Sequence, residues 1–576
     1  MRYQKKLSFF SIGLLVNLSL VILLLGPATV SARGSSNLPE LALEPVATTY
    51  HVALTGNDAN DGSAAAPFRT ITKGASVLHA GDTLIIHAGD YDSEFDISVP
   101  NNGTATAPIT IKAETSGSVT LHGNRQPNQL DGGGVGFTLS AATYIVFDGL
   151  EFNDYSIGIG VYGDPENNGA PYAGHHITIT HCTFKNNGDL GIEIVKTDNV
   201  LISHCTFIGE EPPAGWPDPA NPSAIQDYGV YFWHTNHSIV QDSYFYGAHN
   251  QALSFKQGCY NSIARRNIFD GALYTAVYLG QNRREDGRPK CMNLIAEYNI
   301  VRDTEGYRVK SPIRVDNVEN AIVRNNYVEG FDDTNNTAGI NVFDEALGKI
   351  EIYDNIAAFG VANDNSSGIY ISYALDVSTK VLVHHNTLYH VVQDMFDDTT
   401  RTTFSKNISY QCTYYDETNP DTFRGDPQFI HGDPVQQAIS SAPTEHDFDT
   451  YYQQLTAPFR LAVQSPAVGF GARLQAPALY LPLIAISKGE NNTVIVHWQH
   501  YAGQQDYEMW CGEEPYFAPE GVACAQVSEP PWAAHHAGLG DIAHNHYYLV
   551  TSTSASLGTT TSNRVGAFDF GLVAGE

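Results

Sequence analysis

The sequence predicts an all-β protein in which a right-handed parallel β-helix is followed by a small β-sandwich. Three observations predict this. A segment of the chain repeats about every 28 residues. One position of that repeat is asparagine in six consecutive copies. The composition includes 51 glycines, 32 tyrosines and 26 phenylalanines, which suits many short strands joined by turns rather than a helical bundle or a disordered chain.

The chain begins with the features of a signal peptide, over residues 1–32. Three basic residues stand among the first six, an apolar run extends from Leu7 to Leu25, and Val30-Ser31-Ala32 is a small-residue cleavage signal. We expect cleavage after Ala32, then a linker over 33–48 and an extracellular protein, either released or associated with the cell surface. An uncleaved anchor is the alternative, because the apolar run is long. No later apolar run is long enough to span a bilayer, so we expect no membrane span after cleavage.

The charge balance limits the partners of the protein. The net charge is −31, and without the three basic residues of the leader 28 basic residues stand against 62 acidic ones. Such a surface repels nucleic acid, which we exclude as a partner. It also repels an acidic polysaccharide at long range. An acidic substrate would therefore need a local basic patch or a bridging cation.

The repeat contains a short strand, a bend and a second short strand, and the bend can be followed through nine copies. It falls at Cys182, Cys205, Ser243, Asn267, Asn299, Asn326, Asn355, Asn386 and Asn407. In stacked coils, an inward asparagine at a bend can hydrogen-bond to its copies above and below and satisfy backbone groups there. Leucine-rich repeats need another leucine spacing, and propeller blades are longer. The repeat therefore favours a parallel β-helix.

A further strand in each copy alternates apolar and variable residues, so that one face points inward and the other outward. Two outward columns follow from the alignment. The first is Glu193, Tyr231, Ser254, Tyr278, Arg314, Asn341 and Tyr370, and the second is Val195, Trp233, Lys256, Gly280, Asp316, Phe343 and Ser372. Aromatic rings beside charges on a solvent face are what a sugar-binding cleft requires.

The asparagine column resembles that of the pectate-lyase-like β-helix superfamily. Thr55–Asp58, Pro67–Ile71 and Gly81–Tyr91 resemble the start of bacterial secreted β-helix proteins near polysaccharide lyase family nine, and Asp426–Phe429 and Ser465–Val468 resemble their last coil. The resemblance implies a β-helix over 49–477, with a short helix within 68–79 that covers its open end. A shared fold alone does not establish an activity.

After a linker over 478–490, residues 491–576 resemble a fibronectin type III-like β-sandwich. The segments that carry this resemblance are Val494–Trp498, Tyr507–Trp510, Tyr547–Val550 and Ser562–Val565. Such modules act as spacers or contacts to a surface, so we expect no catalysis there.

Seven cysteines fit an oxidising compartment. Cys182 and Cys205, and likewise Cys259 and Cys291, stand at the same register one coil apart, within disulfide range. Cys511 and Cys524 could close a loop in the tail, which leaves Cys412 over. Buried free thiols are the alternative.

Lys256 is the candidate catalytic residue. Its strand is similar to the lysine strand of polysaccharide lyase families six and nine, which implies that Lys256 is the base that removes the C5 proton of a uronic acid. A lysine can do this only if burial or nearby positive charge lowers its pKa. Arg314 is expected two coils away, roughly 10 Å, and is the second catalytic candidate. We expect Tyr231, Trp233, His234, Tyr278, Glu193, Asp316 and Arg284 to bind substrate.

The sequence departs from both lyase families. Family six has an arginine one coil after the lysine, where this chain has Tyr278 or Gly280, and family nine has a calcium-binding aspartate cluster that is not evident here. Calcium is the one cofactor that the resemblance suggests, and the metal ligands stay unknown. Two long insertions, 210–227 and 283–290, flank the coil of Lys256, and long ordered loops on a solenoid are often functional.

Three functions remain open for a protein whose expected partner is a polysaccharide and which is expected to be a monomer. The first is a lyase that cleaves a uronic-acid-containing polysaccharide by β-elimination. The second is a glycoside hydrolase, which needs two nearby carboxylates, whereas Glu193 and Asp316 are expected four coils, roughly 19 Å, apart. The third is a non-catalytic glycan-binding or cell-surface protein, which the acidity favours.

Overall fold

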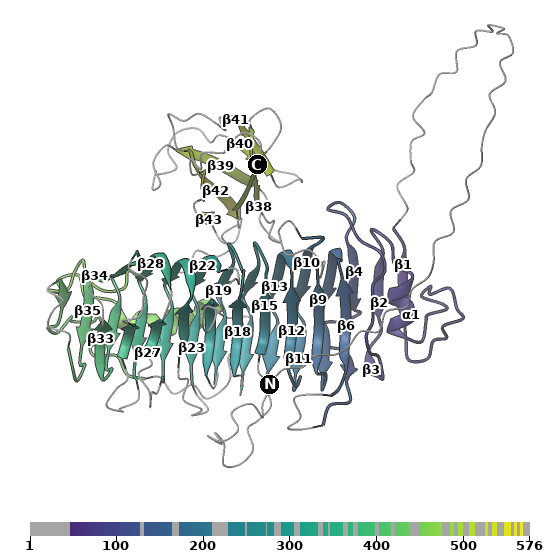
Figure 1. Cartoon of the computed structure of the whole chain (residues 1–576), viewed down its shortest axis with the longest axis horizontal. Coiled ribbons are helices and arrows are strands. Elements are labelled where there is room, and N and C mark those ends of the chain that lie inside the picture. Colours follow the sequence, from purple (N-terminus) through teal and green to yellow (C-terminus); the bar gives the residue numbers. More distant parts are fainter. Residues whose placement is uncertain are drawn as a thin grey trace, which may run out of the picture. The chain divides into compact units, whose positions relative to one another are not determined.

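The computed structural model confirms a right-handed parallel β-helix built from three sheets (Figure 1). It describes residues 47–474 except 127–131, 164–171, 210–227, 248–249, 272–273, 281–289, 304–310, 332–337, 344–345, 361–366, 373–377, 398–401, 416–420 and 437–447, and the backbone of eight strands between residues 484 and 567. The predicted leader, Arg284 and most of both long insertions lie outside the described residues.

Each coil from β4 to β33 contributes strands in the order sheet 1, bend, sheet 2, sheet 3, whereas the first and last coils lack a strand in sheet 3. Sheet 1 contains β1 (Thr49–Val52), β2 (Thr83–Ile86), β4 (Ile109–Ala113), β7 (Thr143–Asp148), β10 (Gly174–Thr180), β13 (Thr197–Ser203), β16 (Ile239–Gln241), β19 (Ile263–Arg265), β22 (Cys291–Glu297), β25 (Val318–Arg324), β28 (Leu347–Tyr353), β31 (Lys380–His384) and β34 (Thr402–Ser405).

Sheet 2 lies after the bend. It contains β3 (Gly89–Asp92), β5 (Val119–His122), β8 (Leu150–Asn153), β11 (Thr183–Lys185), β14 (Thr206–Ile208), β17 (Tyr244–Tyr246), β20 (Ile268–Asp270), β23 (Ile300–Arg302), β26 (Tyr327–Glu329), β29 (Ile356–Ala358), β32 (Thr387–Tyr389), β35 (Asn407–Tyr410) and β36 (Thr422–Phe423).

Sheet 3 carries the two predicted outward columns. It contains β6 (Val135–Ser140), β9 (Ile157–Tyr162), β12 (Leu190–Val195), β15 (Tyr228–Trp233), β18 (Gln251–Lys256), β21 (Thr275–Gly280), β24 (Ile313–Asp316), β27 (Ala338–Val342), β30 (Ser367–Ile371) and β33 (Gln393–Asp397). Apolar side chains from all three sheets fill the lumen.

The predicted asparagine column is confirmed. The side-chain amide of each asparagine donates to the next, with Nδ2 to Oδ1 distances of 3.1 Å for Asn267 to Asn299, 3.0 Å for Asn299 to Asn326 and 2.9 Å for Asn326 to Asn355. The same acceptor oxygens also receive the backbone N–H of the preceding asparagine. The ladder continues to Asn407. It satisfies backbone donors at a bend from which water is excluded.

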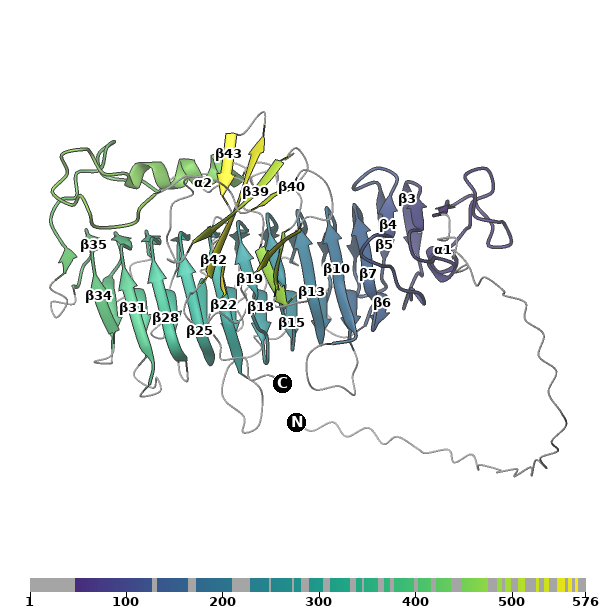
Figure 2. The ribbon, with the colours of Figure 1, turned by 90° about the horizontal axis from the view of Figure 1, so that it is seen from above.

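Two helices cover parts of the solenoid. Figure 1 shows α1 beside β1, and Figure 2 shows α2 alongside the coils. The short helix expected within 68–79 is α1 (Ile71–Ser76), which Thr70 caps by accepting from the N–H of Lys73. The second helix, α2 (Phe448–Thr456), followed by the 3₁₀ helix η1 (Ala457–Phe459), was not predicted. Its apolar residues, with Tyr452 and Leu455 among them, pack on the outer face of sheet 2.

The two disulfides predicted within the β-helix are wrong. Cys182, Cys205, Cys259 and Cys291 are buried free thiols, as is Cys412. In-register stacking places equivalent Cβ atoms about 4.8 Å apart with parallel side chains, whereas a disulfide needs Cβ atoms about 3.5–4.5 Å apart and a twisted bridge. The pairing of Cys511 with Cys524 involves side chains outside the described residues and stays a prediction.

The C-terminal strands form two antiparallel sheets. One contains β37 (Ile484–Lys488), β38 (Thr493–Trp498) and β41 (Ala533–Ala537), and the other contains β39 (Asp506–Gly512), β40 (Ala525–Val527), β42 (His546–Ser554), β43 (Gly558–Thr561) and β44 (Val565–Ala567). Strand β37 lies inside the predicted 478–490 linker. The fibronectin type III likeness stays a prediction. Among the described helices, none combines the length and apolar character needed to cross a membrane.

Candidate functional site

The candidate site is the outer face of sheet 3, where both outward columns are in register as predicted. Glu193 pairs with Tyr231, Tyr231 with Ser254 and Ser254 with Tyr278, and the column continues through Arg314 to Asn341. In the second column Lys256 lies beside Trp233. Leu253 and Phe255, which alternate with Ser254 and Lys256, belong to the lumen. Lys256 therefore projects outward.

Lys256 reaches back over Ser254 into a slot between two tyrosines. Ser254 is small and fully buried, and it donates to Gln251 Oε1 at 2.8 Å. Lys256 Nζ lies 5.1 Å from the ring centroid of Tyr228 and 4.9 Å from that of Tyr278. It also donates to Tyr228 Oη at 3.3 Å. The two rings and the hydroxyl hold the amine at one place on the outer face.

Arg314 and Asp316 form an ion pair on the coil after Tyr278. Arg314 Nη2 lies 2.8 Å from Asp316 Oδ2, and Tyr278 Oη donates to the same oxygen at 3.0 Å. Burial disfavours the charged guanidinium, but Tyr278 and Asp316 outweigh burial, so the pKa of Arg314 lies above its usual value. The predicted two-coil separation from Lys256 is correct, and the Tyr278 ring links the two cations, since Arg314 Cζ lies 5.2 Å from its centroid.

The predicted solvent exposure of Tyr278 and Asp316 is wrong. Tyr278 is fully buried and Asp316 is 3% exposed. Burial, followed by the negative charge of Asp316, raises the pKa of Tyr278 well above its usual value. No pattern in the sequence indicated that Arg314 would lie across this ring and use Asp316 as its counter-ion. Direct substrate contacts of Tyr278 and Asp316 stay predictions.

Glu193 lies two coils before Lys256 and forms a separate pair with Tyr162. Tyr162 Oη donates to Glu193 Oε2 at 2.7 Å. Burial raises the pKa of Glu193, although the hydrogen bond from Tyr162 acts in the opposite direction. Four coils separate Glu193 from Asp316 along the register. This separation supports the estimate from the sequence that the two carboxyl groups are too far apart to act as a hydrolase pair.

Trp233, Tyr231 and His234 lie beside the slot. Trp233 Nε1 donates to Gln257 Oε1 at 2.9 Å, which fixes the indole. Tyr231 packs edge-on against Tyr228, with ring centroids 5.0 Å apart. Burial, and then the positive charge of Lys196, lowers the pKa of His234, so that its ring is neutral at neutral pH. All three predicted binding residues are partly exposed and flank the coil of Lys256.

The described side chains do not fit a calcium ion. Within the described ranges, no three His, Cys, Asp or Glu side chains come together as a metal site. Asp242 is held by Arg266, whose Nε lies 2.6 Å from Asp242 Oδ1. Glu193 is engaged by Tyr162. A calcium requirement stays untested.

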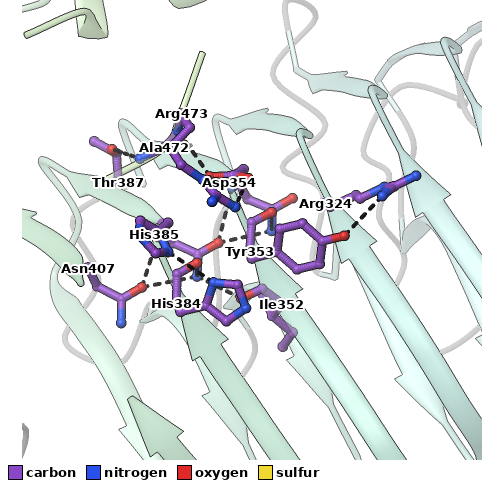
Figure 3. Close-up of polar contacts among 12 residues, drawn as sticks. Arg324, Ile352, Tyr353, Asp354, His384, His385, Thr387, Asn407, Ala472 and Arg473 are labelled. Carbon is purple, nitrogen blue, oxygen red and sulfur yellow. Dashed lines mark hydrogen bonds and ion pairs between the residues drawn. The ribbon is translucent and has the colours of Figure 1, made fainter. Parts of the chain in front are cut away.

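A second polar cluster lies at the bend between sheets 1 and 2, and Figure 3 shows Arg473 lying against Asp354 with Tyr353, His384 and His385 nearby. Arg473 Nη2 lies 2.7 Å from Asp354 Oδ2, and Arg473 also donates through its backbone N–H. Burial lowers the pKa of both histidines. The cluster attaches the segment after η1 to the coils, so its role is structural.

Sequence reasoning missed Tyr228 and Tyr162, the two hydroxyl partners of the site. Tyr162 stands in register with Val195, one coil before the predicted column begins. Tyr228 stands at the first position of its strand, outside both columns. Extending the alignment to the first residue of each sheet 3 strand would have found Tyr228.

Comparisons with known proteins agree on the fold. Residues 50–209 match the family model "Pel9A-like, right handed beta helix region", and residues 135–309 match "Right handed beta helix region". No curated protein matches the chain.

Three solved structures show the range of similar proteins. The GH136 lacto-N-biosidase from Eubacterium ramulus is 13% identical over 65% of this chain and 66% of its own, with a TM-score of 0.43. Pectate lyase Pel9A is 15% identical over 77% of this chain and 92% of its own, with a TM-score of 0.36. PfbA, a surface adhesin of Streptococcus pneumoniae, is 12% identical over 58% of this chain and 83% of its own, with a TM-score of 0.39. At these values the likenesses carry no information on activity.

Proposed function

We propose that this protein is an extracellular polysaccharide lyase that cleaves a uronic-acid-containing polymer by β-elimination on the outer face of sheet 3. The observation that carries the proposal is the position of Lys256 Nζ, held between the rings of Tyr228 and Tyr278 and 3.3 Å from Tyr228 Oη. An amine fixed on the outer face, with a hydroxyl beside it, supplies the base and the acid that an elimination requires.

The proposed reaction uses Lys256 in its neutral form. Its amine takes the C5 proton of the uronic acid, the electrons of that C–H bond form the C4–C5 double bond, and the bond between C4 and the glycosidic oxygen breaks. The leaving oxygen then needs a proton, which the hydroxyl of Tyr228 can supply. The proton on Lys256 returns to Tyr228 through their hydrogen bond, which restores both groups.

The surroundings support binding of a polysaccharide. Trp233 and Tyr231 are partly exposed beside Lys256, where aromatic rings can stack on sugar rings. The match of residues 50–209 to the Pel9A-like family model also favours a polysaccharide partner. Arg314 is poorly suited to neutralise a substrate carboxylate, because Asp316 already compensates its charge. We assign that role to Arg284.

A non-catalytic glycan-binding protein is the second candidate, and one contact favours it. Ring faces at 5.1 and 4.9 Å stabilise a charged ammonium, and a charged ammonium cannot accept a proton. If this effect dominates, the same slot would hold Lys256 as a fixed cation that binds an acidic sugar without cleaving it.

The test is incubation with a panel of uronic-acid polymers, with calcium or with a chelator, while the absorbance of the unsaturated product is followed. We expect Lys256→Ala to lose about a thousandfold in rate, as for removal of a general base. Tyr228→Phe should lose rate with little change in KM. The control is Lys349→Ala, which removes a lysine from sheet 1 whose Nζ lies 2.9 Å from Glu351.

The alternatives give different results. New reducing ends without the absorbance would support a hydrolase. Retained binding without product from any polymer would support the glycan-binding function. Full activity of Lys256→Ala would exclude Lys256 as the base.

A further inference from the structure

Two neighbouring coils of sheet 3 carry complementary polar atoms that lack partners. Within the described residues, Arg314 Nε and Asn341 Oδ1 are buried and have no hydrogen-bond partner. Arg314 on β24 and Asn341 on β27 stand directly opposite each other in the register, on the outward column. One is a donor and the other is an acceptor. A buried polar group without a partner costs about 1–3 kcal/mol, so a pair of them on one face calls for a ligand group.

The orientation of the Asn341 amide is fixed by its other contacts. Its Nδ2 donates to Ser311 Oγ at 2.8 Å and to the backbone carbonyl of Ala338 at 2.5 Å. Exchanging nitrogen and oxygen would place Oδ1 against that carbonyl oxygen, which offers no proton. Oδ1 is therefore the free acceptor of this side chain.

Arg314 offers a donor without an uncompensated charge. Its Nη2 is paired with Asp316, and its guanidinium lies 4.2 Å from the Phe343 ring centroid and 5.2 Å from that of Tyr278. The Nε–H can donate a hydrogen bond, but no positive charge remains for an anion.

We infer that Arg314 and Asn341 form a subsite that binds a hydroxyl group of a neutral sugar. A hydroxyl accepts from Arg314 Nε–H and donates to Asn341 Oδ1, which satisfies both atoms at once. A carboxylate accepts only, so it would oppose Asn341 Oδ1 and lie near the negative charge of Asp316. Arg314 Nε and Asn341 Oδ1 together therefore favour a hydroxyl over a uronate carboxylate.

The position of the subsite defines a substrate class, and this step rests on the proposed function. The subsite lies between the second and third coils after Lys256, about 10–14 Å away, which corresponds to two or three sugars. The polymer is thus one in which neutral sugars separate the acidic ones, rather than one in which every sugar carries a carboxylate.

The test compares two groups of polymers by calorimetric binding and by product formation. Polygalacturonate and alginate carry a carboxylate on every sugar, whereas hyaluronan, heparosan and xanthan also contain neutral sugars. We expect the wild type to bind the second group more tightly. Asn341→Leu and Arg314→Lys should each weaken that binding about tenfold, equivalent to the loss of one good hydrogen bond, and Asn341→Leu should leave binding of the first group unchanged.

The variants separate this inference from the proposed function. Arg314→Lys keeps a cation opposite Asp316 but removes Nε–H, so it remains informative if Asn341→Leu fails to fold. Thr138→Val, on the same face at the first strand of sheet 3, is the control. Tighter binding of the fully charged polymers, or unchanged binding in both variants, overturns the subsite and indicates a buried water only. Binding with the expected losses but without unsaturated product upholds the subsite and contradicts the lyase.

Discussion

The two halves of the β-helix are stabilised by different residues that repeat in register. The N-terminal half has a column of phenylalanines, and the C-terminal half has a column of asparagines. In the N-terminal half, the middle position of sheet 2 is phenylalanine in five consecutive coils, Phe152, Phe184, Phe207, Phe245 and Phe269, whose rings stack with centroids 4.5–5.1 Å apart. From the next coil onward this position is Val301, Val328, Ala357 and Leu388.

The bend changes in the same region. In three coils of the phenylalanine column it carries cysteine or serine, and it carries asparagine from Asn267, in the coil of Phe269, onward. A parallel coil must both fill its corner and satisfy the backbone at its bend, because apolar side chains fill the lumen. The comparison teaches that one half meets this requirement mainly by apolar volume and the other by hydrogen bonds.

The largest expected effect is that of Phe207→Ala. The ring is fully buried between Phe184 and Phe245, and its loss removes apolar contact and leaves a cavity. We expect the free energy of unfolding to fall by about 4 kcal/mol. Phe207→Leu, which keeps most of the side-chain volume, should lower it by only about 1 kcal/mol. Denaturant unfolding measures the loss, and hydrogen exchange locates it. Equal loss of protection in the coils around Asn355 would break the distinction between the halves, because solenoid coils couple mainly to their neighbours.

Asn326→Ala should have the next largest effect on stability. Its amide accepts from the backbone N–H and the side chain of Asn299 and donates to Asn355, all in a buried column. Removing this amide leaves the backbone N–H and side-chain amide of Asn299 without their acceptor. We expect the free energy of unfolding to fall by about 3 kcal/mol.

The matched control is Asn236→Ala. Asn236 belongs to a second, solvent-accessible asparagine ladder, in which its Oδ1 accepts from Asn261 Nδ2 at 3.0 Å. Water can replace that bond, so the cost should be below about 1 kcal/mol. Similar costs for the two variants would show that the buried column owes little to exclusion of water.

Ser243→Asn tests whether the asparagine ladder can be extended into the half that is stabilised by packed phenylalanines. Its expected effect on stability is smaller. Ser243 is the last bend before the asparagines, and its Oγ accepts from the N–H of Cys205 at 3.2 Å. An asparagine there would extend the amide ladder by one coil and should stabilise by about 0.5–1 kcal/mol. Thermal unfolding beside the wild type measures the gain. A clear loss would mean that the packed Phe207–Phe245 corner leaves no room for an amide.

The sequence predicted the elements that depend on repetition. The asparagine column and the sheet 3 register were correct because one physical requirement recurs in every coil, and recurrence makes it visible. The disulfides were wrong for a related reason. Sharing a register, as Cys182 and Cys205 do, gives the spacing of the coils but not the direction of the side chains.

The site was predicted less completely because its contacts do not recur. The outward position of Lys256 followed from alternation, but its place between Tyr228 and Tyr278 depends on the conformation of one long side chain. The burial of Tyr278 depends on the pair between Arg314 and Asp316, and no other copy in the two outward columns carries arginine and aspartate at these positions. Helix α2 was missed because only its packing on sheet 2 distinguishes it from a loop.

The smallest effect expected concerns pH, where the outer face differs from both columns. Neither the phenylalanines nor the asparagines titrate, whereas burial raises the pKa of Glu193 in the folded protein. The folded state therefore holds this proton more tightly than the unfolded state does. Stability from this group is complete below the usual glutamate pKa and is lost as pH rises through the raised value.

Glu193→Gln tests this by comparing melting temperatures between pH 4 and 8. The variant keeps an acceptor for Tyr162 but has no proton to lose, so its melting temperature should rise relative to the wild type as pH increases and then level off. Glu151→Gln, which removes one negative charge from sheet 2, is the control. A constant difference across this range would mean that Glu193 is solvated as well in the folded protein as in the unfolded chain. The outer face would then be as insensitive to pH as the two columns inside.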